Sequence, residues 1–434
     1  MQRDRIISAI DIGSSKIVTL IAHMTEEAEA RVIGVSTTPS RGLRKSQVVN
    51  IEEATDAISA SVEAAERMAG TSVAQVFVSV GGSHIASMNS HGVVAVSEPD
   101  KEITANDIKR VIDAAKAVQL PTSRDILHVL PRGYSVDGQE GIVDPVGMSG
   151  VRLEVETHLV TGGSTAIRNL HKCIEELGIE VVDVAFGGLA SAVATLSDTE
   201  KELGVVLVDI GGGTTDVAIF VDGALSYSSV IPIGAINITK DLAAGLRVSL
   251  ESAEKIKLRL GQIAKAPMMV DEERPRVGKT EKDDELDIAD LGLPEGMRSV
   301  SRKTLVEGII KPRLNEIFAM VALEIKRSGF GGMTPSGVVL TGGGALTMGA
   351  VESARRNLAM PVHIGIPQRI TGLVDEIMTP TYAAAVGLLL WGDKQGGSEG
   401  TTAGLFSGIG KLGGNLHMKG LAGKVVNLVK SFLP

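Results

Sequence analysis

The sequence is poor in cysteine, in aromatic residues and in basic charge, and each shortage excludes a class of protein. Its one cysteine, Cys173, cannot form a disulfide within the chain, which favours a reducing cytoplasm. Aromatic residues are 3% of the 434 residues and the formal net charge is −9, so no basic stripe with interleaved aromatic side chains is present for a nucleic acid. No apolar run is long enough to cross a membrane, and the strand residues that begin at Ile6 argue against a signal peptide.

Apolar residues and glycine are plentiful instead. With 44% apolar residues the chain can bury two or more cores, and its 51 glycines suit an α/β protein with many turns. Three glycine clusters directly follow short apolar runs, and they carry most of the functional interpretation.

The central cluster lies within residues 203–227. An apolar run at 205–208, typical of a strand buried on both faces, ends at Asp209, and a second strand is predicted from Asp216. A strand–turn–strand argues against a Walker loop or a dinucleotide fingerprint, because both need a helix directly after the glycines. Backbone N–H groups and hydroxyls of such a turn can bind a phosphate, and the flanking acids can hold a hydrated divalent cation. The candidate phosphate ligands are Gly211, Gly212, Gly213, Thr214 and Thr215. For this cluster alone, a glycine hairpin without a ligand is the alternative.

The same pattern occurs near the N-terminus. An apolar strand at residues 6–10 precedes a polar turn, and a second strand follows at 17–22. The turn contains Asp11, Gly13, Ser14, Ser15 and Lys16. This repetition indicates a duplicated unit, and two facing hairpins can hold a polyphosphate from both sides.

The third cluster is Gly342, Gly343 and Gly344, after a predicted strand at 338–340. Here a helix is predicted to follow through residues 348–358, which would let a base or a phosphate approach the glycine backbone at a helix start. Two helices of small residues, at 187–196 and 380–390, are predicted to cross closely at a hinge.

Residues 84–158 have a different predicted secondary structure, with several strands and one clear helix that begins at Thr104, with Asp107 three positions on. This pattern predicts a small α+β insert. His128 and His158 lie in or beside apolar strands without acids at ligand spacing, so we expect packing residues rather than a metal site.

The C-terminal region changes character after Gly392. Residues 393–420 are rich in Gly, Ser and Thr and predict a flexible linker. Beyond it, at 100° per residue, one arc is apolar and the other basic and polar, a pattern typical of a helix bound at a membrane interface. The residues assigned to this membrane helix are Leu421, Lys424, Val425, Val426, Leu428, Val429, Lys430, Phe432 and Leu433. A helix that docks on the protein or on another subunit is the alternative.

Together the three clusters resemble the two phosphate motifs and the adenosine motif of the actin, Hsp70 and sugar-kinase superfamily. Over nearly the whole chain the sequence is similar to the FtsA family of bacterial cell-division proteins, the actin-like anchors of the tubulin-like FtsZ. The most specific marks are residues 128–131 (HVLP), 139–142 (QEGI), 147–152 (GMSGVR) and 370–373 (ITGL), with the tail helix.

The resemblance implies an α/β fold. Two duplicated actin-like (ribonuclease H-like) lobes would enclose a nucleotide cleft, with a small α+β insert in the first lobe and a C-terminal amphipathic helix. The implied divisions are 1–83 with 162–197 (lobe 1A), 84–161 (insert 1C), 198–240 with 336–392 (lobe 2A), 241–335 (subdomain 2B), 393–420 (linker) and 421–434 (membrane helix).

Carried over by position, the resemblance implies ATP and Mg²⁺ as cofactors. Asp11 and Asp209 would hold the magnesium through water. Ser14, Ser15 and Lys16 would contact phosphates opposite the 211–215 turn. Glu254 and Lys257, three positions apart on one helix face, would line the adenosine, and the third glycine cluster would pass under the base.

The implied partners are a second copy of the chain, later division proteins, FtsZ and an anionic membrane. The insert would serve self-assembly and recruitment, while the basic end formed by Arg298, Arg302 and Lys303 would bind the acidic, partly apolar C-terminal peptide of FtsZ. The tail helix would place the protein at the division septum, on the cytoplasmic face of the inner membrane.

No residue can be defended from sequence as the base that activates water. We therefore expect tight ATP binding with slow or absent hydrolysis, the nucleotide favouring a polymerising conformation. Two alternatives stay open. An actin-like pilus-assembly adaptor would not need its own lipid helix, and a small-molecule kinase would need a base near the γ-phosphate and would leave the tail helix unexplained.

Overall fold

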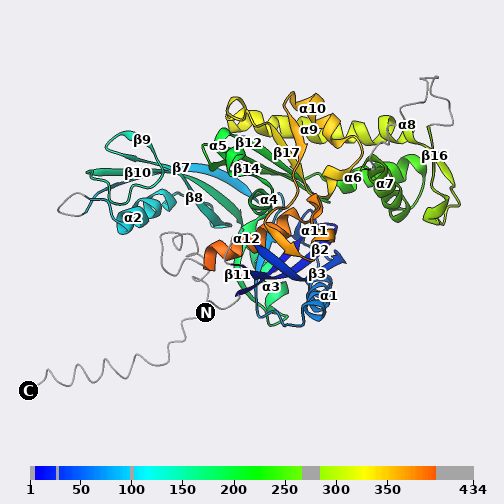
Figure 1. Cartoon of the computed structure of the whole chain (residues 1–434), viewed down its shortest axis with the longest axis horizontal. Coiled ribbons are helices and arrows are strands. Elements are labelled where there is room, and N and C mark those ends of the chain that lie inside the picture. The colour runs from blue at the N-terminus through cyan, green and yellow to red at the C-terminus, as the bar shows by residue number, and fades with distance from the viewer. Residues whose placement is uncertain (1–4, 26–28, 98–101, 266–283, 397–434) are drawn as a thin grey trace, which may run out of the picture.

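The structure, a computed structural model, describes residues 5–25, 29–97, 102–265 and 284–396 (Figure 1). Two β-sheets with their helices form the centre of the molecule. A third sheet with one helix extends from one end, and the helical region that contains α8 (Arg302–Leu305) lies at the opposite end (Figure 1). The predicted tail helix, and the predicted linker beyond residue 396, lie outside the described residues.

The first sheet has six strands in the order β11-β6-β1-β2-β3-β19. They are β1 (Arg5–Ile12), β2 (Lys16–Met24), β3 (Ala30–Pro39), β6 (Gln75–Val80), β11 (Glu180–Phe186) and β19 (Ile370–Gly372). The first three form an antiparallel meander, whereas β6 is parallel to β1. Because side chains alternate along a strand, Ile10 of β1 enters the core under α1 (Ile51–Ala69) and α3 (Ser164–Glu175), while Ala9 enters a separate core under α12 (Ala383–Gly396).

The second sheet repeats this arrangement in the order β14-β13-β12-β17-β18. Its strands are β12 (Val205–Ile210), β13 (Thr215–Val221), β14 (Ala224–Ile231), β17 (Val338–Thr341) and β18 (Val362–Ile364). Strand β12 is antiparallel to β13 and parallel to β17, so it has the place that β1 has in the first sheet. The predicted duplication is therefore confirmed, and both leading strands have an acid as their next-to-last residue, just before a glycine turn.

The insert is a four-stranded antiparallel sheet in the order β7-β10-β8-β9, with α2 (Ala105–Lys116) packed on it. Its strands are β7 (Ala86–Ala95), β8 (Arg124–Val136), β9 (Gln139–Ile142) and β10 (Arg152–Gly163). As predicted, Thr104 and Asp107 form a capping box at the start of α2. Both predicted packing histidines are buried, and the backbone N–H of Phe186 donates to Nε2 of His128 at 2.9 Å.

The insert attaches to the second sheet, although its chain interrupts the first. Ser87 Oγ donates to the carbonyl of Ser228 at 2.6 Å, and Asn89 Nδ2 donates to the carbonyl of Ser226 at 3.2 Å. The ring of His158 bridges the same elements, with Nε2 2.9 Å from Ser228 Oγ. These bonds cover the edge strand β14, whose backbone would otherwise be free to pair with another chain.

The segment between β14 and β17 is mostly helical. It contains α6 (Ala235–Leu246), α7 (Leu250–Lys265), the short strands β15 (Glu285–Asp287) and β16 (Ser299–Ser301), then α8, the π-helical turn η3 (Val306–Ile310) and α9 (Lys311–Ser328). An apolar stripe of helical spacing runs through residues 301–327 and would by itself indicate a single helix, but the structure divides this stretch. Pro312 has no N–H to donate four residues back, and it is accommodated in the first turn of α9.

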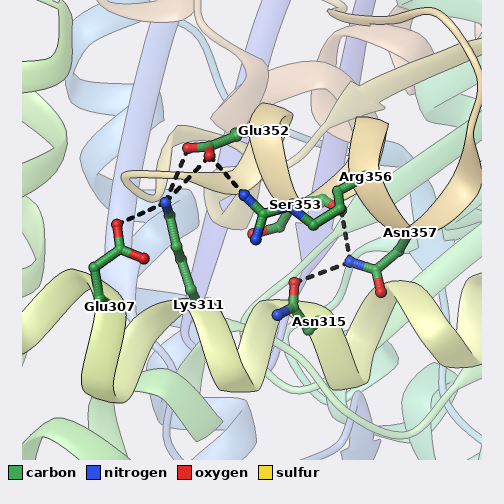
Figure 2. Close-up of polar contacts among 7 residues, drawn as sticks. All are labelled: Glu307, Lys311, Asn315, Glu352, Ser353, Arg356 and Asn357. Carbon is green, nitrogen blue, oxygen red and sulfur yellow. Dashed lines mark hydrogen bonds and ion pairs between the residues drawn. The ribbon is translucent and has the colours of Figure 1, made fainter.

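An ionic cluster fastens this helical segment to α10 (Ala350–Leu358), the helix after the third glycine cluster (Figure 2). Lys311 Nζ lies 2.7 Å from Glu307 Oε1 and 3.1 Å from Glu352 Oε2, and Arg356 also donates to Glu352, at 2.9 Å. Lys311 is only 9% exposed, so its two carboxylate partners compensate for the loss of water around its charge.

The two helices of small residues cross closely, as predicted. They are α4 (Gly187–Thr195) and α12, and a Cβ on Gly387 would lie 1.8 Å from the carbonyl oxygen of Ala190. Helix α12 continues to Gly396, so the prediction that the linker begins at 393 is wrong; Arg5 donates to the carbonyl of Gly392 at 3.2 Å near this helix end. No helix in the described ranges is both long and apolar enough to span a membrane.

The remaining elements are short connections. They are β4 (Leu43–Arg44), β5 (Gln47–Val48), α5 (Asp198–Leu203), η2 (Ala289–Leu291), η4 (Gly331–Met333), η5 (Gly343–Leu346), α11 (Val374–Ile377) and η6 (Pro380–Tyr382).

Candidate functional site

A cleft of about 610 Å³ lies where the turns of the two central sheets meet. This volume is within the roughly 300–1,000 Å³ usual for small-molecule sites. All three glycine clusters reach it, together with α7. The predicted site residues that line it are Asp11, Gly13, Ser14, Ser15, Lys16, Asp209, Gly211, Gly212, Glu254, Lys257, Gly342, Gly343 and Gly344. The fold therefore brings residues far apart in the sequence to one cavity.

Three predicted phosphate ligands, Gly213, Thr214 and Thr215, are not among the residues that line the cleft. Thr215 is the first residue of β13, and its hydroxyl donates to the carbonyl of Ile233 at 2.8 Å. Thr214 is 6% exposed. Its Oγ1 lies 3.4 Å from Ser46 Oγ. In this structure both hydroxyls have partners within the protein, and neither threonine lines the cavity.

The two phosphate-type turns touch each other. A Cβ on Gly212 would lie 2.7 Å from Ser15 Cβ, and a Cβ on Gly213 would lie 2.8 Å from Ser14 Cβ. Ser14 Oγ in turn accepts a hydrogen bond from the backbone N–H of Ser46 at 2.7 Å. Glycine is needed here because any side chain would push the two turns apart.

Asp11, the next-to-last residue of β1, is a partly buried acid that lines the cleft. Ser79 Oγ, from the neighbouring strand β6, donates to Asp11 Oδ1 at 2.6 Å. Burial raises the pKa of Asp11, and both the bond from Ser79 and the positive charge of Lys16 oppose that rise.

Asp209 has the equivalent place in the second sheet, as the next-to-last residue of β12. Ser191 Oγ, from α4, donates to Asp209 Oδ2 at 2.5 Å. Burial raises the pKa of Asp209 to about 6, against the hydrogen bond from Ser191, while the negative charge of Asp11 adds to the rise.

Lys16 supplies a cation that interacts with both acids. Burial lowers the pKa of Lys16 to about 8, and the charges of Asp11 and Asp209 oppose this shift. Its Nζ lies 4.4 Å from the centre of the Tyr382 ring, a cation–π distance. A phosphate entering the cleft would meet this ammonium group directly.

Glu254 and Lys257 form the other wall with Thr239 of α6. Lys257 Nζ donates to Glu254 Oε2 at 2.7 Å and to Thr239 Oγ1 at 2.8 Å. Two exposed apolar side chains, Leu250 and Leu258, also line this wall. Apolar surface beside a few fixed polar groups is suited to a heterocyclic base and its ribose.

The third cluster differs from its prediction. A 3₁₀ turn, η5 (Gly343–Leu346), follows Gly342, and α10 begins only at Ala350. Gly342, before η5, and Gly349, before α10, both have positive φ, +79° and +85°. A regular helix cannot continue through either residue. A Cβ on Gly342 would lie 2.1 Å from Asp209 Oδ1, so only glycine fits beside that acid.

The sequence interpretation missed several residues of the site. Thr239, Pro380 and Thr381 line the cleft, and Ser79 and Ser191 hold its acids. Ser191 could have been noticed in the sequence, because it is a polar residue within a predicted helix of small, mostly apolar residues. Ser79 carries no such signal, because a serine near a strand end is common.

The donor set fits magnesium better than a softer metal. In the described ranges no group of three or more His, Cys, Asp or Glu side chains could enclose a metal ion. Two carboxylates, Asp11 and Asp209, face the cleft instead. Magnesium typically takes one or two carboxylates, several waters and the phosphates of its substrate.

The predicted basic group lies at the far end of the molecule from the insert (Figure 1). Arg298 precedes β16, while Arg302 and Lys303 begin α8, which Ser301 caps. All three side chains are exposed.

Comparison with known proteins identifies the fold and the family. The structure is similar to the PilM–PilN type IV pilus biogenesis complex, with a TM-score of 0.57 at 14% identity over 90% of this chain and 99% of that chain. It is also similar to MreB5 of Spiroplasma citri bound to ADP, with a TM-score of 0.52 at 14% identity over 91% and 99%. Two related sheets around one cleft, in a fold shared with these structures, define an actin-like protein.

The sequence relatives define it further. Residues 82–161 match the model of the SHS2 domain inserted in FTSA, and residues 206–387 match that of Cell division protein FtsA. The chain is 42% identical over 396 residues to Cell division protein FtsA of Pseudomonas aeruginosa, covering 90% of each. The chain belongs to the FtsA family of cell-division proteins, which confirms the predicted family and the actin-like α/β fold with its insert.

Proposed function

We propose that the chain binds ATP with Mg²⁺ in the cleft between its two sheets. The observation that carries this proposal is the meeting of two acid-and-glycine turns on one cavity. Asp11 and Asp209 would hold the ion, and Lys16 with the facing turns would contact the phosphates. MreB5, which shares the fold, was determined bound to ADP.

When bound, magnesium would neutralise charge on the phosphates. The chain's own residues fix the nucleotide between the lobes: the turns grip the phosphates, and Glu254 and Lys257 face the adenosine. Because α4 contacts both sheets and packs against α12, nucleotide in the cleft would favour one relative arrangement of the lobes, which we propose is the polymerising one. No catalytic base was assigned from the sequence, and we expect hydrolysis to be slow or absent.

We base the proposed assembly role on membership of the FtsA family and on the predicted C-terminal helix. The protein would polymerise on the cytoplasmic face of the inner membrane at the septum, anchored by residues 421–434. The exposed Arg298, Arg302 and Lys303 would bind the acidic C-terminal peptide of FtsZ, and the insert would recruit later division proteins. Membership of the FtsA family favours this role over a pilus-assembly adaptor or a small-molecule kinase. The division into subdomains 1A, 1C, 2A and 2B is part of the same proposal.

Calorimetric titration of Mg-ATP tests the site. We expect Gly212→Ala to weaken binding at least about tenfold, roughly 1.4 kcal/mol, because its Cβ would lie 2.7 Å from Ser15 Cβ. The control is Gly133→Ala on β8, where a Cβ would meet nothing within 4 Å. Absence of ATP uptake by the unmodified chain, or equal affinities of the two variants, would contradict the proposal. Turnover as fast as that of metabolic kinases would contradict the expected slow hydrolysis.

A further inference from the structure

Each of the two acids on the cleft is held by a serine from a neighbouring element. Ser79 Oγ donates to Asp11 Oδ1 at 2.6 Å, and Ser191 Oγ donates to Asp209 Oδ2 at 2.5 Å. The two serines come from unlike elements, a strand and a helix, so the duplicated fold alone does not account for both. The shared feature is the chemistry, one hydroxyl donor for each carboxylate.

The direction of the first bond is fixed by a second one. Ser79 Oγ also accepts a hydrogen bond from the backbone N–H of Ile12 at 3.0 Å, which leaves its own hydrogen for Asp11. Ser79 is 4% exposed and Ser191 is fully buried. Water therefore cannot readily replace either hydroxyl.

Each serine engages only one oxygen of its carboxylate. Among the hydrogen bonds between described residues, none involves Asp11 Oδ2 or Asp209 Oδ1, and both acids line the cleft. A hydrogen bond to one oxygen fixes the rotation of the carboxyl group and directs the other oxygen to the cavity. Such outer hydrogen bonds orient metal-binding groups, and their loss typically weakens metal binding by about 10–100-fold.

The second bond also crosses between the halves of the fold. Helix α4 follows β11 of the first sheet, whereas Asp209 is the next-to-last residue of β12 in the second. The orientation of Asp209 therefore depends on how the two halves sit against each other. A change in their arrangement would alter this acid directly.

We propose that Ser79 and Ser191 are positioning residues that hold Asp11 and Asp209 oriented to receive the hydrated magnesium of the nucleotide. This inference depends on the proposed ATP site. It adds that the effect of the serines is specific to magnesium and is not a general contribution to folding.

The experiment measures ATP affinity by calorimetry across a magnesium titration and again with EDTA, on the full chain. For Ser79→Ala and for Ser191→Ala we expect the magnesium concentration at half-effect to rise about tenfold. We expect ATP affinity without magnesium to stay within about twofold, because the phosphate turns are untouched. Ser61→Ala is the matched control, since Ser61 is fully buried and its hydroxyl bonds Thr19 Oγ1 at 2.8 Å, in the core between α1 and β2.

Each outcome decides something. If both serine variants keep the magnesium dependence of the unmodified chain, or lose affinity equally with and without magnesium, the positioning role is wrong. The same holds if Ser61→Ala shifts the magnesium dependence as much as they do. If the unmodified chain takes up no ATP at all, the proposed function fails instead. The two serines are separate tests, and affinity in EDTA shows whether each variant has folded.

Discussion

His158 is a buried imidazole at the contact between the insert and the second sheet. Its Nδ1 lies 2.7 Å from Asn89 Oδ1 and its Nε2 lies 2.9 Å from Ser228 Oγ, so the neutral ring can donate on one side and accept on the other. Burial lowers the pKa of His158 to about 3, and the charges of Arg132 and His128 lower it further. Protonation would place a second donor where the ring now accepts.

This gives a stability prediction with a definite sign. The folded pKa is about 3, below the ordinary value of about 6.5 expected in the unfolded chain. Stability from the neutral ring is therefore present above pH 6.5 and lost as pH falls towards 3, by up to about 5 kcal/mol. We expect His158→Gln to flatten this loss in urea unfolding measured from pH 7 to pH 4. A slope unchanged in His158→Gln would contradict the assignment.

At the residue scale, the sequence allowed the acids and glycines of the cleft to be predicted, because both occur in local patterns. Asp11 and Asp209 follow apolar strands, and each glycine turn is contiguous. Ser79 and Ser191 could not be predicted in the same way, since their partners lie 68 and 18 positions away. Contacts of this kind depend on which strands and helices become neighbours, and that is a property of the fold.

At the element scale, the close crossing of α4 and α12 requires glycine at position 387. A Cβ on Gly387 would lie 1.8 Å from the backbone oxygen of Ala190, a position that no side-chain movement can relieve. We expect Gly387→Ala to lower the free energy of unfolding by about 3 kcal/mol, because the two helices must separate. Gly332→Ala, where a Cβ would meet nothing within 4 Å, should change it by no more than about 0.5 kcal/mol.

Equilibrium urea unfolding of both variants checks this prediction. Equal stability of Gly387→Ala and the unmodified chain would mean that the helices are not held at this distance in solution. A second measurement, ATP affinity, separates packing from function: if the crossing also fixes the arrangement of the lobes, Gly387→Ala should weaken nucleotide binding as well.

The elements that the sequence predicted best were those with strong periodicity and clear ends. Strands β1, β2 and β12 and helix α2 fall close to their predicted places, since apolar runs and the Thr104 cap mark them locally. The division of residues 301–327 into α8, η3 and α9 was missed, because an apolar stripe of helical spacing continues through the π-turn. The late start of α10 was missed because two glycines of positive φ cannot be distinguished from other glycines in a sequence.

At the scale of the whole molecule, the insert and the exposed basic group lie at opposite ends (Figure 1), and none of their residues lines the cleft. Binding of a partner at either end is therefore compatible with an occupied cleft. The attachment of the insert to β14 links one of these ends to the second sheet. Neither arrangement follows from the sequence pattern, which places the insert only within the chain of the first sheet.

The predicted tail would supply the remaining large-scale role that we propose, attachment to lipid. Its apolar arc would be buried at the headgroup boundary, while Lys424 and Lys430 would attract anionic lipid. We expect the full chain to sediment with anionic liposomes and a chain ending at Gly420 to remain in the supernatant. Salt should weaken binding only partly, because screening acts on the charges and not on the burial of apolar area.

Two variants that carry the same added charge distinguish insertion of the apolar arc into the lipid from electrostatic attraction of the lysines to anionic lipid. Val425→Glu places a carboxylate on the apolar arc and should abolish sedimentation, because a buried charge must lose its water. Asn427→Glu adds the same charge to the polar arc, where it can stay hydrated, and should reduce binding only modestly. If the two variants sediment equally, the helix is not inserted by its apolar face. If the truncated chain sediments as well as the full one, lipid contact comes from the body of the protein and the tail serves another purpose, such as docking on a second subunit.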